Sequence, residues 1–151
     1  MSSGPRISAQ APGPTATTTA SLLVVVNAVA DAPTLSTHDT TGAVNTPIAL
    51  NVATALTDTD GSESLSIVIG NVPAGAVLNH GTNNGNGTWT LTQGQLSGLT
   101  ITPPHDSDVD FTLTVTATST EGANGDIAIT TGTLNVVVNA VADAPTLTAS
   151  N

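Results

Sequence analysis

Apolar and polar side chains alternate with a period of two along several short stretches of the chain. The clearest stretch runs from Phe111 to Ala117, where apolar residues alternate with threonine. Successive side chains of a β-strand point to opposite faces, so this pattern predicts a strand with an apolar inner face and an outer face of threonine. No segment shows a convincing helical period. The chain is therefore predicted to be all-β.

Turn-forming dipeptides separate these stretches. Asn84-Gly85, Asn86-Gly87 and Asn124-Gly125 suit tight turns, because Asn and Gly accept positive φ angles. Strands are predicted at Thr34–Thr37, Ile48–Leu56, Leu65–Ile69, Val77–Leu78, Thr88–Thr92, Leu99–Thr102, Phe111–Thr118 and Ile127–Val138. About seven strands in roughly 110 residues are typical of an immunoglobulin-like Greek-key β-sandwich.

A twelve-residue sequence occurs twice. Val24–Leu35 reads VVVNAVADAPTL and recurs unchanged as Val136–Leu147, 112 residues later. This period is a domain length, so it predicts a tandem array whose units meet at the repeated segment. We divide the chain into a disordered tail or linker (1–21), the last strand and linker of a preceding repeat (22–32), one β-sandwich repeat (33–139) and a linker to the next repeat (140–151).

The predicted strand at Leu22–Val26 belongs to the preceding repeat and lacks its own sheet here. We expect it to be disordered or to pair with the edge of a neighbouring molecule, in a chain that is otherwise a monomer in solution. This apolar run is far too short to span a bilayer, so no direct membrane insertion is expected. The N-terminus lacks the layout of a secretion signal, and any export signal is expected outside these residues.

The charge of the chain is strongly one-sided. Its formal net charge is −10, from 11 Asp and Glu residues and one basic residue, Arg6. Nucleic acid and anionic membranes are therefore poor partners, because both would repel this surface. There is no cysteine, so no disulfide stabilises the fold. Clustered carboxylates without Lys or Arg need another source of positive charge, which a divalent cation provides.

The acidic residues gather in two groups. Because consecutive strands of a sandwich alternate in direction, their loops collect at two poles, and every acidic residue except Asp39 falls in a segment assigned to a pole. The first pole has Asp31, Asp58, Asp60, Glu63, Glu121 and Asp126, and the opposite pole has Asp106, Asp108, Asp110 and Asp143.

The sequence Asp58-Thr59-Asp60-Gly61-Ser62-Glu63 is the best candidate metal site. Alternate carboxylates before a glycine direct two oxygens to one side of a tight turn, and Glu63 can close the ring. Calcium takes six to eight hard oxygen ligands, which this loop, Asp31 and backbone carbonyls can supply. The alternative is a solvated loop in which Asp and Gly only form the turn.

The second acidic group lies beside Pro103-Pro104. Its three aspartates, at positions 106, 108 and 110, repel one another unless a cation or the linker of the next domain intervenes. Alternatively, Asp110 has no ligand role and only marks the start of the strand that begins at Phe111. His105 is expected to be exposed to solvent and not to bind calcium, because calcium prefers oxygen ligands.

The linker is expected to be stiff. Ala32-Pro33 holds the chain extended after Asp31, because the residue before a proline avoids the helical region. Ions coordinated at each joint, between the linker aspartate and the 58–63 loop of the following unit, would convert a hinge into a rod.

Several motifs together resemble the extender repeats of giant repeats-in-toxin (RTX) adhesins of Gram-negative bacteria. They are the linker at Asn27–Pro33, the loop at Leu56–Glu63, Asn86–Thr92 and Leu99–Pro104. The resemblance implies an immunoglobulin-like or cadherin-like sandwich, calcium at the joints, type I secretion and an extracellular, cell-surface role in attachment and biofilm formation. Neighbouring repeats of the same chain would be its partners.

By this resemblance the best calcium ligands are Asp31, Asp58, Asp60 and Glu63. Asp108 and Asp110 would serve the next joint through Asp143. The linker also resembles the inter-domain motif of cadherins, but Val29 and Ala30 stand where cadherins carry ligands. The number of ions at each joint therefore stays open.

Other functions have less support in the sequence. No nucleophile and base occur with local support, so an enzyme is not expected. A glycan-binding module usually needs exposed aromatic residues, whereas Trp89 is the only tryptophan and is expected to fill the core. Ice or surface binding would use the threonine arrays at 88–92 and 112–118, although threonine is also ordinary on the solvent face of a strand.

Overall fold

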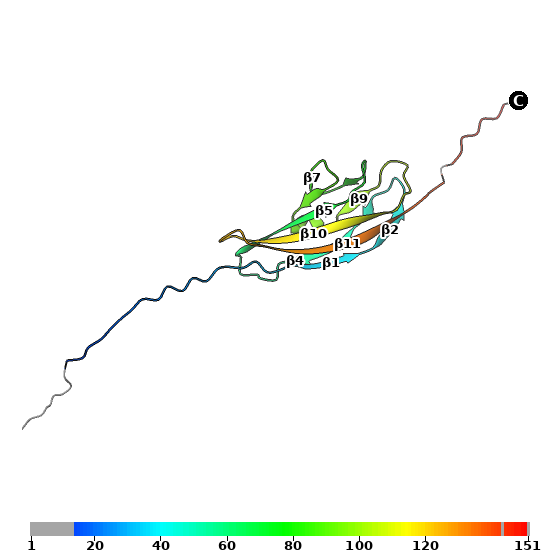
Figure 1. Ribbon diagram of the computed structural model, residues 1–151. Helices are drawn as coiled ribbons and strands as arrows, with labels where there is room; N and C mark the ends of the chain where they lie inside the picture. Colours follow the sequence, from blue (N-terminus) through cyan, green and yellow to red (C-terminus); the bar gives the residue numbers. More distant parts are fainter. Residues whose placement is uncertain (1–13, 143, 151) are drawn as a thin grey trace, which may run out of the picture.

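The computed structural model describes residues 14–142 and 144–150, and this part of the chain is all-β (Figure 1). Its strands are β1 (Thr34–His38), β2 (Thr40–Ala43), β3 (Ile48–Ala49), β4 (Asn51–Ala55), β5 (Glu63–Gly70), β6 (Val77–Leu78), β7 (Thr82–Asn83), β8 (Trp89–Leu91), β9 (Thr100–Thr102), β10 (Phe111–Glu121) and β11 (Ile127–Asn139). One short 3-10 helix, Gln93–Leu96, lies between β8 and β9. The described residues include no helix with the length and apolarity to cross a membrane.

The strands form one large sheet and two small ones. The large sheet has the order β2-β11-β10-β5-β8-β7, and the small sheets are β1-β4 and β3-β9-β6. Neighbouring strands are antiparallel except β2, which runs parallel to β11. Leu50 alone separates β3 from β4, and its N–H donates to the carbonyl of Leu99 at 3.0 Å. The two small sheets are therefore continuous along this backbone.

The core lies between the large sheet and the two small ones. In β10, Leu113, Val115 and Ala117 are fully buried, while Thr112 and Thr114 are exposed, which confirms the predicted alternation. Side chains from all three sheets meet in one apolar cluster that includes Ile48, Leu50, Val52, Ile67, Ile69, Leu78, Leu91, Leu99, Ile101, Leu113, Val115, Leu134 and Val136.

Two strands were not predicted. Thr40–Ala43 and Thr82–Asn83 have no apolar alternation, and each is a strand because its backbone pairs with a neighbour, β11 and β8 respectively. The single strand predicted at Ile48–Leu56 is divided at Leu50. These differences arise from backbone pairing, which leaves little trace in a short polar sequence.

The strands β5 and β10 extend further toward one pole than predicted. The predicted loops contained Glu63 and Glu121, whereas Glu63 begins β5 and Glu121 ends β10, and the two residues are paired across the ladder. Both side chains are buried. Two buried carboxylates therefore face each other at the end of the sheet.

The segments before β1 and after β11 leave the body at opposite ends (Figure 1). Leu22–Val26 has no strand structure and is exposed, with Val24 and Val26 at 69% and 86%. In the second copy of the same sequence, Val136 and Val138 are 0% and 4% exposed. The disorder predicted for residues 1–21 falls mostly on residues 1–13, which lie outside the described residues.

The packing of β10 makes a stability prediction. Leu113→Ala should lower the free energy of unfolding by roughly 2–5 kcal/mol, because it removes a fully buried side chain from the centre of the core. Thr114→Ala, at the adjacent exposed position, should cost less than about 1 kcal/mol. Urea denaturation of the two variants measures both values, and equal losses would contradict this assignment of the faces.

Candidate metal centre

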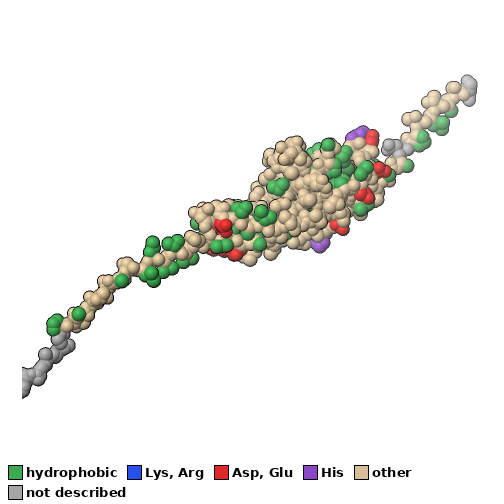
Figure 2. Space-filling view, in the orientation of Figure 1, with side chains coloured by type: hydrophobic (Ala, Val, Ile, Leu, Met, Phe, Trp, Pro, Cys, Tyr) green, Lys and Arg blue, Asp and Glu red, His purple; other side chains and the backbone are tan. Residues whose placement is uncertain are grey.

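The linker before β1, the 57–62 loop and the 122–126 turn meet at one end of the molecule. The N–H of Gly122 donates to the carbonyl of Ser62 at 2.8 Å, which joins the loop to the turn. Acidic side chains lie at both ends of the body in Figure 2. We refer to the end formed by residues 28–33, 57–63 and 119–126 as the entry pole.

Three carboxylates come together at the entry pole. One oxygen from each of Asp31, Asp58 and Glu63 lies within 4.8 Å of the other two. Asp31 comes from the linker, Asp58 from the loop and Glu63 from the start of β5. Asp31 is exposed, Asp58 half-buried and Glu63 buried, so the triad leads from solvent into the protein.

Glu63 has one satisfied and one unsatisfied oxygen. Its Oε1 accepts the backbone N–H of Asp31 at 2.8 Å, which fixes the carboxylate beside the linker. Its Oε2 is buried and has no hydrogen-bond partner among the described residues. A buried carboxylate oxygen without a partner is costly, so this atom would be stabilised by a bound cation or by the N–H or O–H group of a further donor.

Side chains of the repeat also bind the backbone of the linker. Four side chains donate to linker carbonyls: Asn124 Nδ2 to Ala28 (2.7 Å), the Ser119 hydroxyl to Asp31, the Thr57 hydroxyl to Ala32 (2.6 Å) and the Thr130 hydroxyl to Pro33 (2.6 Å). In the opposite direction, Asp126 Oδ2 accepts the N–H of Ala30 at 2.9 Å. Residues 28–33 are thus held along one side by the strands and loops that follow them.

No cationic side chain balances the entry pole among the described residues, because the only Lys or Arg of the chain is Arg6. The three triad carboxylates, with one oxygen of each within 4.8 Å of the other two, repel one another when charged. Glu121 is buried nearby and accepts hydrogen bonds from the Ser62 hydroxyl (3.2 Å) and the Ala123 N–H (3.1 Å). Both of its oxygens therefore have donors, whereas Glu63 Oε2 has none among the described residues.

Asp60 does not join the triad, although the spacing of the loop placed it with Asp58. Its Oδ1 accepts the N–H of Ser62 at 2.8 Å, so this carboxylate closes its own turn. The hydroxyl and the backbone N–H of Ser62 hold the pKa of Asp60 below its usual value. Asp58 in turn accepts the N–H of Asp60 at 3.0 Å. Asp126, which the sequence also suggested as a ligand, accepts the N–H of Ala30.

The second acidic group is arranged differently. Asp106 exchanges two hydrogen bonds of 2.8 Å with Asn45, and Asp110 accepts the N–H of Val138 at 2.8 Å. Asp108 is exposed beside the exit of β11. Asp143, the predicted partner of this group, lies outside the described residues. Within the described ranges, the entry-pole triad is the one group of three possible ligand side chains whose oxygens lie within 4.8 Å of one another.

His105 is exposed, as expected from the sequence, with its side chain 86% accessible. Its Nδ1 lies 3.1 Å from Asp106 Oδ2. The neighbouring aspartates thus use backbone and amide donors, and His105 contacts them only at the surface.

Sequence reasoning missed the residues that fix the linker. Ser119 and Thr130 carried no signal, because single hydroxyl residues are common in strands. Asn124 was interpreted only as a turn residue before Gly125, although its amide also reaches Ala28. The repeated sequence offered the one usable clue, because it marks residues 28–33 as part of a segment that occurs twice.

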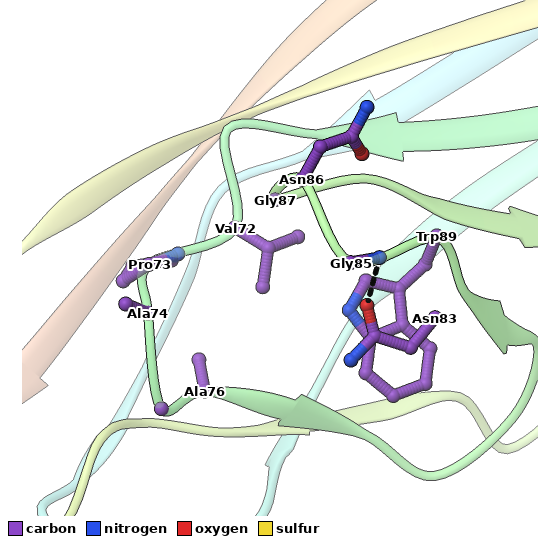
Figure 3. Close-up of a pocket in the computed structure, with 10 residues that line it drawn as sticks. Val72, Pro73, Ala74, Ala76, Asn83, Gly85, Asn86, Gly87 and Trp89 are labelled. Atoms are coloured by element: carbon purple, nitrogen blue, oxygen red, sulfur yellow. Dashed lines mark hydrogen bonds between the residues drawn. The ribbon is translucent and has the colours of Figure 1, made fainter.

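A separate cavity of about 420 Å³ lies between the 72–76 loop and the 83–87 turn (Figure 3). Its polar wall includes Asn83, whose Oδ1 accepts the N–H of Gly85 at 2.9 Å. Trp89 lines the cavity but is only 8% exposed and belongs to the core. It therefore lacks the open aromatic face on which sugars usually stack.

The triad can hold a metal ion. Three carboxylates supply up to six oxygens, and they come from a linker, a loop and a strand end that hydrogen bonds already hold in place. Comparisons of the chain with protein families, with curated proteins and with solved structures found no match.

The turn at Asp60 makes a prediction about pH. Ser62→Ala should raise the pKa of Asp60 toward its usual value, because it removes the hydroxyl that favours the charged form. The bonds of Asp60 stabilise the fold above its unfolded pKa and are lost as pH falls through its folded pKa. Carboxyl carbon NMR across a pH titration measures the shift, with Thr59→Ala as the control. An unchanged pKa in the Ser62 variant would contradict this cause.

Proposed function

We propose that this chain is one unit of a calcium-stabilised array of β-sandwich repeats that acts as an extender of a large cell-surface adhesin. The buried Oε2 of Glu63, without a partner beside Asp31 and Asp58, carries the proposal, because it places unmet negative charge at the joint between repeats. The twelve-residue identity supports the array, since it recurs after the length of one domain.

The pairing order of the strands favours an immunoglobulin-like or cadherin-like sandwich. The small sheets pair β1 with β4, β3 with β9 and β9 with β6, which matches the A-B-E-D order of such folds. The large sheet pairs β11 with β10 and β10 with β5, which matches G-F-C. A first strand divided between β1 and β2, with β2 parallel to β11, joins the two sheets at one edge.

Calcium suits the donor set better than other common metals. The triad offers only carboxylate oxygens, and the chain has no cysteine, so the soft or nitrogen ligands typical of zinc are missing at this pole. Calcium accepts six to eight oxygens at flexible geometry, whereas magnesium requires a near-ideal octahedron and keeps several waters. Ligands from three separate segments at unequal depth favour the more tolerant ion.

The metal would join the linker to the repeat. Without it, Asp31, Asp58 and Glu63 repel one another across the junction, and that repulsion opposes the hydrogen bonds that hold the linker. Bound calcium would replace this repulsion with attraction of each carboxylate to the ion, and it would hold Asp31 beside Glu63 at the start of β5. Entry and exit segments leave at opposite ends of the body, so fastened joints would give a linear array (Figure 1).

The cellular role rests on the resemblance to extender repeats of RTX adhesins. It supports secretion to the cell surface of a Gram-negative bacterium, with neighbouring repeats as partners and a distal adhesive region held away from the cell. An extracellular site also suits the metal, because free calcium outside cells reaches the millimolar range that weak modules of this kind use. A structural spacer, not an enzyme, is the function we propose.

Calcium should raise the melting temperature of the single-repeat protein. At a free calcium concentration about 100 times the Kd, the free energy of unfolding should rise by roughly 2.7 kcal/mol, and the melting temperature by roughly 10 °C. Calorimetry of chelated protein titrated with calcium measures this shift. Magnesium at the same ionic strength is the control. An equal rise in melting temperature with the two ions would contradict the assignment of calcium.

Glu63→Gln should change stability in opposite directions with and without calcium. In chelator the variant should be more stable than the parent by roughly 1–2 kcal/mol, because it removes the charge of a buried carboxylate that has an unpartnered oxygen. In calcium it should lose most of the stabilisation, because a neutral amide is a poor ligand. Urea denaturation under both conditions measures the crossover.

Glu121→Gln provides the matched control. Glu121 is equally buried and directly opposite Glu63, but its oxygens already accept hydrogen bonds. This variant should keep the calcium-dependent rise in stability. If both variants lost that rise equally, the metal would not be assigned to the triad.

A further inference from the structure

The contact between Asn124 and Ala28 indicates how two repeats would meet in the proposed array. Asn124 stands in the turn between β10 and β11, and its amide donates to the Ala28 carbonyl at 2.7 Å. Ala28 is the first linker residue after the end of the preceding repeat. The turn of one repeat therefore reaches back to the point where the preceding repeat ends.

The same point exists at the exit of this repeat. Ala140 is the counterpart of Ala28 in the second copy of the repeated sequence, and β11 ends one residue earlier, at Asn139. Ala140 lines a cavity of about 240 Å³ together with Val44, Asn45, Asp106, Asp108 and Val141. In an array, a turn that binds the Ala140 carbonyl would lie beside the residues that line this cavity.

We infer that this cavity is the docking surface for the 121–126 turn of the next copy of the repeat. The inference rests on the proposed function, because it takes the chain to be one unit of an array. The occupant is the tip Gly122-Ala123-Asn124-Gly125, with its asparagine on the carbonyl of Ala140. The contact between repeats is thus an end-to-end interface with a defined register.

The chemistry of the tip suits the cavity. The cavity wall carries two aspartates and no cation, so it favours the uncharged tip at 122–125 over the flanking Glu121 and Asp126 as the part that enters it. The tip is uncharged, exposed and made of small residues around Asn124. Gly125 has a φ of 75°, which allows the tight turn that carries the asparagine amide outward.

The cavity is also held to the strand that leads into the next repeat. The N–H of Val44 donates to the carbonyl of Asn139 at 3.0 Å. Asn45 is fixed by its paired hydrogen bonds with Asp106. The wall therefore keeps its position relative to the end of β11, which immediately precedes Ala140.

Disulfide trapping in a two-copy protein tests this interface. Residues 1–139 followed directly by residues 28–151 give two repeats joined at the identical segment, and the chain has no native cysteine. Asp108→Cys in the first copy and Ala123→Cys in the second form the test pair, since both positions are exposed. The pair should oxidise at least about tenfold faster than a control pair, because a disulfide needs its two Cα atoms within about 7 Å.

The control pair is Asp108→Cys in the first copy and Thr59→Cys in the second, at the same pole but on the other loop. Adding Asn124→Ala to the second copy should slow the test pair toward the control rate, because the anchoring amide is lost. Oxidation is followed by mass spectrometry, in calcium and in chelator. Test and control rates that are equal under both conditions would overturn the interface.

This outcome is independent of the metal proposal. Calcium binding is measured on the single-repeat protein, which has no second copy to dock. Calcium stabilisation without trapping would overturn the interface alone. Trapping without any calcium stabilisation would support the interface and refute calcium at the triad.

Discussion

The buried carboxylate oxygen of Glu63, which has no partner among the described residues, is the constraint on which the entry pole depends. Between Ile7 and the C-terminus the chain has no fixed positive charge, so each carboxylate must be stabilised by water, by N–H and O–H donors or by a cation. Asp60, Asp126 and Glu121 accept hydrogen bonds from the protein. Glu63 retains one oxygen without a partner among the described residues, next to two further carboxylates, so a cation bound there would have three carboxylates within reach.

This constraint connects the sheet to the linker. Glu63 begins β5, and its other oxygen accepts the N–H of Asp31, so the charge at the strand end and the position of the linker are coupled through one side chain. Hydrogen bonds along residues 28–33, two of them to the carboxylates of Asp126 and Glu63, set the path of the linker. In the proposed function, the charge of the triad determines how firmly that path is held. Under the proposed function, the fold would fix the geometry and a bound ion the stiffness.

Much of the fold could be read from the sequence, because burial in a sheet imposes a period of two. Phe111–Ala117 shows that period and lies in the central strand of the core. The strands at Thr40–Ala43 and Thr82–Asn83 could not be predicted, since backbone pairing alone holds them. In the site, acidic spacing identified Asp58 and Glu63, but spacing could not separate Asp58 from Asp60. That separation depends on the N–H of Ser62, which turns Asp60 back onto its own loop.

The sequence by itself determined the all-β character, the period of the repeat and the concentration of acid at the joint, because these are patterns of residue type along the chain. Tertiary structure decided what the repeated segment becomes. Val136–Asn139 lies in a sheet between β10 and β2, whereas the identical residues 24–27 are outside every sheet and exposed. The twelve residues are the same, so the difference comes from the neighbouring strands that are present only around the second copy. A β-strand is completed by its partners, and its own residues supply only one side of each ladder.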